Sequence, residues 1–104
     1  MKRYRILMTE PAAEDLLKIA EYTARELREP ATAQKLVGKI KEAVMSLVEM
    51  PTRYATVAGE RLATQGIRKL PLENYIVFYV ISERDGTVTV VRILHGRRDW
   101  EHLL

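Results

Sequence analysis

The stretch "ENYIVFYVISERDGTVTVVRILH", residues 73–95, decides the fold. It contains two long runs rich in valine, isoleucine and aromatic residues, which are typical of strands that are buried on both faces. The polar segment "RDG" (residues 84–86) separates the runs and has the length of a hairpin turn. The sequence therefore predicts two neighbouring antiparallel strands at the centre of a sheet.

Two further segments are strand candidates. "GIRKLP" (residues 66–71) is typical of a short strand that ends at Pro71, and residues 72–74 are few enough for a second hairpin connection. Near the N-terminus, residues 4–8 alternate weakly between apolar and polar side chains. We therefore expect an N-terminal strand and, later in the chain, a three- to four-stranded antiparallel sheet.

Between these segments the hydrophobic period changes to that of two helices. Thr9 is suited to cap the first helix, and apolar residues then recur at helical spacing as far as Leu27, with Asp15 outside the apolar stripe. After the break "REP" (residues 28–30), a second stripe continues to Leu47. Because the break is short, the two helices should fold back on each other as an antiparallel hairpin.

The predicted order is strand, helix, helix and then at least three consecutive strands, which indicates a two-layer α+β fold. A chain of 104 residues has room for one core, so we expect a single domain over residues 1–104. Residues 52–65 follow neither period and predict a loop with one short turn or strand. Loops of this length are often functional.

The composition argues against several kinds of site. There is no cysteine, and the two histidines, His95 and His102, lack partners at metal-ligand spacing. No glycine-rich phosphate loop or Gly-x-Ser-x-Gly motif is present. The longest apolar run, residues 75–81, is too short for a membrane span, and the N-terminus lacks the apolar core of a signal peptide. We therefore expect a cytoplasmic protein without a metal, a cofactor or a membrane partner.

Arginine is concentrated in the second half of the chain. From Pro51 onward there are eight basic and six acidic residues, and seven of the eight basic residues are arginine. Arginine presents a planar fork of donors that grips phosphate or carboxylate at two points. This bias favours an anionic partner, and an ordinary solvated surface explains it equally well.

The last strand predicts a sheet face that the helices leave bare. Strict alternation divides it into two sets, Val88, Val90, Arg92 and Leu94 against Thr89, Val91, Ile93 and His95. The helices should cover one face only, and burying an unpaired charge is costly, so Arg92 is expected on the bare face. Arg68 should share that face if the strand register allows.

The segment after this strand, "GRRDW" (residues 96–100), is predicted to turn and form a protruding edge. Because aromatic residues and arginines most often anchor interfaces, the candidate partner-binding residues are Arg68, Arg92, Arg97, Arg98 and Trp100. Asp99 is expected to pair with a neighbouring arginine. His95, at the strand end, is either a general acid or base or a hydrogen-bonded histidine that orients the tail.

In order along the chain, "AAEDLLKIAEYTARE", "SLVEMP", "IRKLPLENYIVFYVI" and "VVRILHGRRDW" resemble the RelE/ParE superfamily of toxins from type II toxin–antitoxin modules. The resemblance covers nearly the whole chain. It implies a small cytoplasmic growth inhibitor that a cognate antitoxin masks in a toxin–antitoxin hetero-oligomer. RelE-like members cleave mRNA on the ribosome without a metal, whereas ParE-like members poison DNA gyrase and are not nucleases.

The RelE-like reading matches this chain at few positions. RelE- and YoeB-like nucleases carry an arginine where this chain has Ile76, and RelE carries a lysine where it has Pro71 and a tyrosine where it has Leu103. Only Lys69 and Arg97 match the basic positions of RelE.

His95 matches the terminal histidine of YoeB-like nucleases, but Gly96 follows it in place of tyrosine. The pattern formed by residues 93–99, Ile-Leu-His-x-Arg-x-Asp, resembles ParE more closely. The resemblance therefore favours the ParE-like side.

Three functions stay open at this point. The first is a non-enzymatic inhibitor that binds and poisons DNA gyrase. The second is a metal-independent, ribosome-dependent mRNA endoribonuclease, in which His95, Lys69 and Arg97 would be catalytic and Arg92 would help to bind phosphate. The third is a nontoxic member that only binds its antitoxin and represses its own operon.

Overall fold

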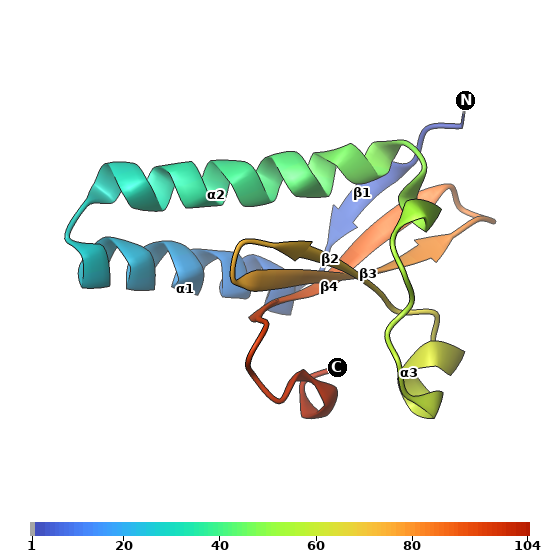
Figure 1. The fold of residues 1–104 in the computed structure, drawn as a ribbon. Helices are drawn as coiled ribbons and strands as arrows, with labels where there is room; N and C mark the ends of the chain where they lie inside the picture. Colours follow the sequence, from blue (N-terminus) through green and yellow to red (C-terminus); the bar gives the residue numbers. More distant parts are fainter. Residues whose placement is uncertain (1) are drawn as a thin grey trace.

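The computed structural model describes residues 2–104 and shows a helical hairpin packed on one face of a four-stranded sheet (Figure 1). The strands are β1 (Arg5–Met8), β2 (Arg68–Leu72), β3 (Tyr75–Ser82) and β4 (Thr87–His95). The helices are α1 (Glu10–Leu27), α2 (Pro30–Met45) and the short α3 (Glu60–Thr64). Single 3₁₀ turns lie at Ser46–Val48, Pro51–Arg53 and Trp100–His102. Across the described residues, each helix is too short or too polar to span a membrane.

Local sequence signals set the limits of the helical hairpin. The Thr9 side chain accepts a hydrogen bond from the backbone N–H of Ala12 and so caps α1, as predicted. The helix ends at Arg28, whose φ of 52° lies in the left-handed region that stops a helix. Pro30 then begins α2, because proline is tolerated in a first helical turn. The two helices pack against each other as the predicted antiparallel pair.

The sheet is mixed, with the strand order β1-β4-β3-β2. β2, β3 and β4 form the predicted antiparallel hairpins, and β1 joins the sheet as a fourth strand that runs parallel to β4. A parallel pair needs a long connection, and the helical hairpin together with β2 and β3 provides it. The direction of β1 was beyond sequence analysis, because it depends on where this connection returns.

A β-bulge in β4 changes which of its side chains share a face. The register with β3 shifts between Phe78 and Tyr79, which leaves Val91 as an extra residue in β4. Beyond the bulge, Ile93 packs in the helix-facing core and Leu94 packs on the opposite face. The prediction of strict alternation to the end of this strand is therefore wrong.

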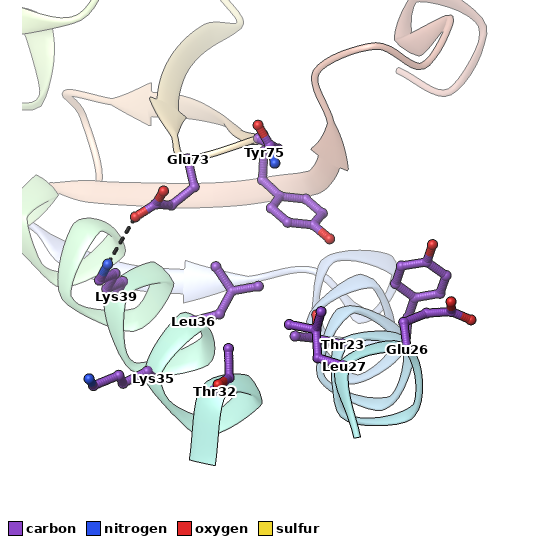
Figure 2. A pocket seen from close by; sticks show the side chains of 11 residues that line it. Thr23, Glu26, Leu27, Thr32, Lys35, Leu36, Lys39, Glu73 and Tyr75 are labelled. Carbon is purple, nitrogen blue, oxygen red and sulfur yellow. Dashed lines mark hydrogen bonds and ion pairs between the residues drawn. The ribbon is translucent and has the colours of Figure 1, made fainter. Parts of the chain in front are cut away.

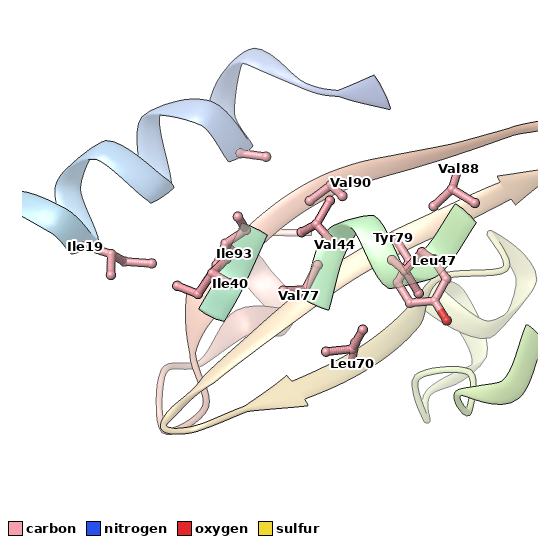
Figure 3. Close-up of a cluster of buried hydrophobic side chains, with 11 residues drawn as sticks. Ile19, Ile40, Val44, Leu47, Leu70, Val77, Tyr79, Val88, Val90 and Ile93 are labelled. Atoms are coloured by element: carbon pink, nitrogen blue, oxygen red, sulfur yellow. The ribbon is translucent and has the colours of Figure 1, made fainter. Parts of the chain in front are cut away.

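The main core lies between the hairpin and the sheet, and Figure 3 shows most of its side chains meeting there. Its buried members are Ala12, Ile19, Ile40, Val44, Leu47, Leu70, Val77, Tyr79, Val88, Val90 and Ile93. The hydroxyl of Tyr79 donates a hydrogen bond to the carbonyl oxygen of Pro51, so its polar atom is satisfied inside the core. Burial raises the pKa of Tyr79 to about 12.

A second hydrophobic cluster occupies part of the opposite sheet face. Its buried members are Val57, Leu62, Ile67, Phe78 and Leu94, and Trp100, Leu103 and Leu104 pack against them. The prediction that this face is bare is therefore wrong. Exposing these apolar side chains to water would cost free energy in proportion to their area. The loop that contains α3 and the C-terminal tail fold over them and bury them.

Candidate functional site along helix α1

A groove runs along α1, between the helical hairpin and one end of the sheet. It consists of two adjoining hollows of about 450 and 500 Å³, which share Tyr22, Asn74 and Tyr75. The first hollow lies between α1, α2 and the β2–β3 turn, and the second lies between α1 and the end of β4. Because three residues line both hollows, they form one continuous surface depression.

The first hollow lies where the helical hairpin extends beyond the sheet (Figures 1 and 2). Leu27 and Leu36 give it an apolar lining, and the ring of Tyr75 points from the start of β3 toward α1 (Figure 2). At its edge, Lys39 Nζ lies 3.0 Å from Glu73 Oε1 and links α2 to the β2–β3 turn. This ion pair is exposed, so it contributes little to stability.

The second hollow contains His95, the last residue of β4. The imidazole meets the Tyr75 ring edge-on, with ring centroids 5.5 Å apart and an interplanar angle of 77°. His95 Nδ1 accepts a hydrogen bond from the backbone N–H of Arg97 at 3.2 Å, so the neutral ring carries its proton on Nε2. This contact links the end of β4 to the first residues of the tail.

The groove combines an apolar floor with an excess of positive charge at its rim. The charged side chains that line it are Asp15, Lys18, Glu26, Lys35, Lys39, Glu73 and Arg98. Two of the three carboxylates, Asp15 and Glu73, are already engaged in ion pairs. Lys18, Lys35 and Arg98 therefore leave the groove net basic, with Glu26 as the opposing charge.

Asp15 and Arg92 form a bidentate ion pair between α1 and β4. Arg92 Nε donates to Asp15 Oδ2 at 2.7 Å and Arg92 Nη2 donates to Asp15 Oδ1 at 2.8 Å. The backbone N–H of Ile93 donates to the same carboxylate at 3.0 Å. The hydrogen bonds that Arg92 donates to Asp15 raise the pKa of Arg92. β1 ends at Met8 and pairs with β4 only as far as Val90. Beyond that point, the Asp15 carboxylate accepts the hydrogen bond of the Ile93 backbone N–H.

Arg92 starts from the sheet face opposite the helical layer, as predicted, but the expectation that its side chain is bare there is wrong. Its side chain is 22% exposed and that of Asp15 is 9% exposed, so the pair is largely enclosed. A sequence signal for it was present, because Asp15 is spaced three and four residues from the buried Ala12 and Ile19. Because Asp15 was predicted to lie outside the apolar stripe, its pairing with Arg92 was not predicted.

Arg68 does not share a face with Arg92. It pairs with Tyr79 in the sheet register and so points toward the helical layer, whereas Arg92 pairs with Phe78 on the opposite face. Its Nη1 donates to the carbonyl oxygen of Tyr54 at 2.7 Å, and at 3.3 Å to that of Thr52. Arg68 therefore anchors the segment that follows α2, and the proposed shared face is corrected.

The C-terminal tail divides the remaining candidates. Arg97 and Arg98 are exposed, as predicted, and Arg98 lines the groove. Trp100 does not protrude, because its ring packs on Phe78 with centroids 5.2 Å apart. Asp99 pairs with His102 at 3.3 Å rather than with an arginine.

The three residues considered for RNA cleavage do not converge. Lys69 pairs with Phe78 and His95 pairs with Tyr75, and these partners belong to hydrophobic clusters on opposite faces of the sheet. Lys69 and His95 therefore point away from each other. Arg97 lies beside His95 through the backbone contact to its imidazole, so two of the three candidates are neighbours.

The family model of the ParE toxin of the type II toxin–antitoxin system parDE matches residues 6–100. The match covers the hairpin, the sheet except for Arg5 of β1, and the start of the tail. The chain belongs to the ParE toxin family. The sequence resemblance and the predicted α+β architecture are thereby confirmed. No curated protein is similar enough to match.

Solved structures share the ParE fold over almost their whole length. A chain of the chromosomal ParDE toxin–antitoxin system from P. aeruginosa is 25% identical, with a TM-score of 0.71 over 91% of this chain and 98% of that chain. A chain of the RelBE2 toxin–antitoxin complex from Mycobacterium tuberculosis is 22% identical, with a TM-score of 0.65 over 94% and 97%. A chain of the archaeal RelE–RelB complex from Pyrococcus horikoshii is 16% identical, with a TM-score of 0.62 over 94% of this chain and 100% of that chain. This ParE toxin therefore has the fold common to RelE and ParE chains.

Proposed function

We propose that this ParE toxin inhibits growth by binding and poisoning DNA gyrase, and that a cognate antitoxin neutralises it by occupying the groove along α1. The observation that carries the proposal is the ParE family match over residues 6–100, which include the groove and the exposed end of β4. The target-binding residues would be Arg97 and Arg98, which are exposed just after β4.

The arrangement of the sheet supports binding rather than RNA cleavage. A phosphate undergoing cleavage needs its acid, base and cationic groups within hydrogen-bonding reach of one site. Lys69 and His95 lie on opposite faces. The position at which the nucleases carry an arginine is occupied by Ile76, whose side chain packs in the second hydrophobic cluster and lies near Gly96.

The groove has the properties expected of an antitoxin-binding site. Its lining is mainly apolar, and Tyr22, which lines both hollows, is 54% exposed. Large exposed apolar side chains beside a depression mark interaction sites. Lys18, Lys35 and Arg98 at the rim favour an acidic amphipathic segment, because opposite charges select the partner and speed its encounter. The solved ParDE, RelBE2 and RelE–RelB structures are toxin–antitoxin assemblies, which supports a partner of this class.

Expression of the chain alone in bacteria tests the target. Growth should stop, chromosomal breaks should accumulate in a gyrase-dependent manner, and mRNA on ribosomes should stay intact. The His95→Ala variant should retain this activity, because His95 would not act as an acid or base. Codon-spaced mRNA cleavage that His95→Ala abolishes would support the endoribonuclease instead. Unimpaired growth would support the nontoxic, antitoxin-binding member.

Expression with the neighbouring antitoxin gene tests the groove. Lys18→Glu and Lys35→Glu should weaken antitoxin binding and restore growth arrest in the presence of antitoxin, because both place a negative charge beside an acidic segment. Lys41→Glu, the same charge reversal outside the groove, is the matched control and should stay neutralised. Full neutralisation of both groove variants would contradict the assignment of the groove.

A further inference from the structure

The face of the helical hairpin that points away from the sheet carries apolar side chains without a partner. On α1, residues three or four apart turn a common side outward, namely Ala13, Leu17, Ala20 and Ala24. Leu17 is 61% exposed, the most exposed of the large hydrophobic side chains in the described chain. Neither hollow of the groove along α1 includes it, so this face is separate from the candidate site.

On the same face, α2 contributes a depression opposite α1. It measures about 340 Å³ and is lined by Ala20, Ala33, Gln34, Val37, Gly38 and Lys41. A Cβ atom built on Gly38 would meet no atom within 4 Å, so nothing in the protomer requires glycine there. Glycine inside a helix costs about 1 kcal/mol relative to alanine. Gly38 lowers the stability of the helix and leaves open space beside it. Glycine at this position is explained if a side chain of another chain occupies that space.

We propose that this face binds a second copy of the same chain in a two-fold symmetric dimer, with α1 of each protomer lying over α2 of the other. The charges on the two helices favour this pairing. Glu14 projects from the outer side of α1, whereas Lys41 of α2 lines the depression. Within the described part of the chain, no ion pair engages either of these side chains.

The helix positions match when the symmetry axis runs parallel to the hairpin. Counted away from the interhelical turn, Leu17 is about level with Gly38, and Glu14 with Lys41. Rotation about such an axis keeps each level. Leu17 of one copy would therefore enter the depression at Gly38 of the other, and the oppositely charged Glu14 and Lys41 would lie side by side next to it. A self-complementary patch of this kind is what a two-fold interface requires.

The alternative pairing of α1 on α1 is unfavourable. It requires an axis across the hairpin, which would bring Glu14 of one copy to Glu21 of the other and place acidic side chains together. The open depression at Gly38 would then lie away from Leu17. The charges and the depression therefore select the same arrangement.

Sedimentation equilibrium of the purified full-length chain, up to about 1 mM, tests the dimer. The wild type should show a reversible monomer–dimer equilibrium. Leu17→Glu, Gly38→Leu and Lys41→Glu should each weaken association at least about tenfold, and adding Glu14→Lys to Lys41→Glu should restore it. Arg84→Glu, in the β3–β4 turn, should leave association unchanged. Circular dichroism confirms that each variant is folded.

Several results would overturn the proposal. A wild type that stays monomeric over the whole range, or a Leu17→Glu variant that associates like wild type, excludes this interface. So does failure of Glu14→Lys to restore association of folded Lys41→Glu. If Leu17→Glu instead loses antitoxin binding while the wild type is monomeric, the face belongs to the antitoxin. None of these outcomes bears on gyrase, so the proposed function is tested separately.

Discussion

Asp15 shows how one side chain can define the functional end of a strand. Its carboxylate accepts hydrogen bonds from two nitrogen atoms of Arg92 and from the backbone of Ile93, just past the bulge in β4. Arg92 also donates to the carbonyl oxygen of Leu103 at 3.3 Å, so the same ion pair helps to hold the tail. The position of His95 and the arginines after it therefore depends on a residue of α1.

Replacing Asp15 with alanine should lower the free energy of unfolding by about 3 kcal/mol, because it leaves the Arg92 guanidinium largely enclosed without its counter-charge. Asp15→Asn should cost less, about 1 to 2 kcal/mol, because an amide oxygen still accepts from the Ile93 N–H. Urea unfolding measures both. Glu26→Ala, an exposed carboxylate on the same helix, is the control and should change stability by less than about 0.5 kcal/mol. Equal effects of Asp15→Ala and Glu26→Ala would show that the pair is not structural.

Tyr79 should make the protein less stable in alkali. Its pKa is raised from 10.0 to about 12 in the folded chain, chiefly by burial. The unfolded chain therefore ionises first, and stability that is fully present below pH 10 should be lost as the pH rises toward about 12. By pH 11 the loss should be roughly 1 kcal/mol. Urea unfolding at about pH 9 and pH 11 measures it, and Tyr79→Phe should show a smaller decrease. Identical decreases in the two proteins would contradict this assignment.

Single residues were predicted from sequence only where their role was local. Thr9 was assigned correctly as a helix cap, because its partner lies three residues away. The partners of Arg68 and Arg92 were missed, because they lie 14 and 77 residues away and depend on the bulge and on the packing of α1. Exposure was predicted correctly for Arg97 and Arg98, which follow the last strand.

Among the elements, helix α2 contains a position that is not optimised for stability. Gly38 lies in its interior and is exposed, and no atom lies within 4 Å of the place that a Cβ atom would take there. Gly38→Ala should therefore raise the free energy of unfolding of the monomer by about 0.5 to 1 kcal/mol, as measured at low protein concentration. Gly86→Ala is the contrasting control, because a φ of 65° makes alanine unfavourable there. A Gly38→Ala variant less stable than wild type would mean that the added methyl group meets a neighbour after all.

The C-terminal tail should depend on the contact between Trp100 and Phe78. Trp100→Ala removes a half-buried indole from the second hydrophobic cluster and should cost about 2 kcal/mol. Trp100→Phe keeps an aromatic ring on Phe78 and should cost less. Thermal unfolding followed by circular dichroism compares the two. Wild-type stability of Trp100→Ala would mean that the tail does not close over the sheet.

Elements with a strong internal period were predicted well. The residues assigned to the last strand, 87–95, coincide with β4, and the helical hairpin follows the two apolar stripes. The bulge at Val91 and the parallel pairing of β1 were not predicted, because both result from contacts between distant segments. The cover over the second face was missed for a related reason, since the segment with α3 and the tail have too few apolar residues to show a period.

For the molecule as a whole, the candidate site exists only after folding. Its groove combines α1, the start of α2, the β2–β3 turn and the end of β4, and no motif in any one of them indicates a depression. The resemblance along the chain predicted the family, but it could not show which part of the surface is hollow or charged. The hairpin extends beyond the sheet and forms one side of the groove (Figure 1). Just after the end of β4, the exposed Arg98 lines the groove and the exposed Arg97 precedes it in the chain.

The most direct measurement is DNA cleavage by purified gyrase in the presence of the purified chain, with supercoiled plasmid as substrate. The wild type should trap linear DNA, and the double variant Arg97→Ala, Arg98→Ala should trap at least about tenfold less while staying folded. An antitoxin segment bound in the groove should suppress trapping by the wild type. Absence of linear DNA with active gyrase, together with cleavage of mRNA on purified ribosomes by the same preparation, would contradict the account.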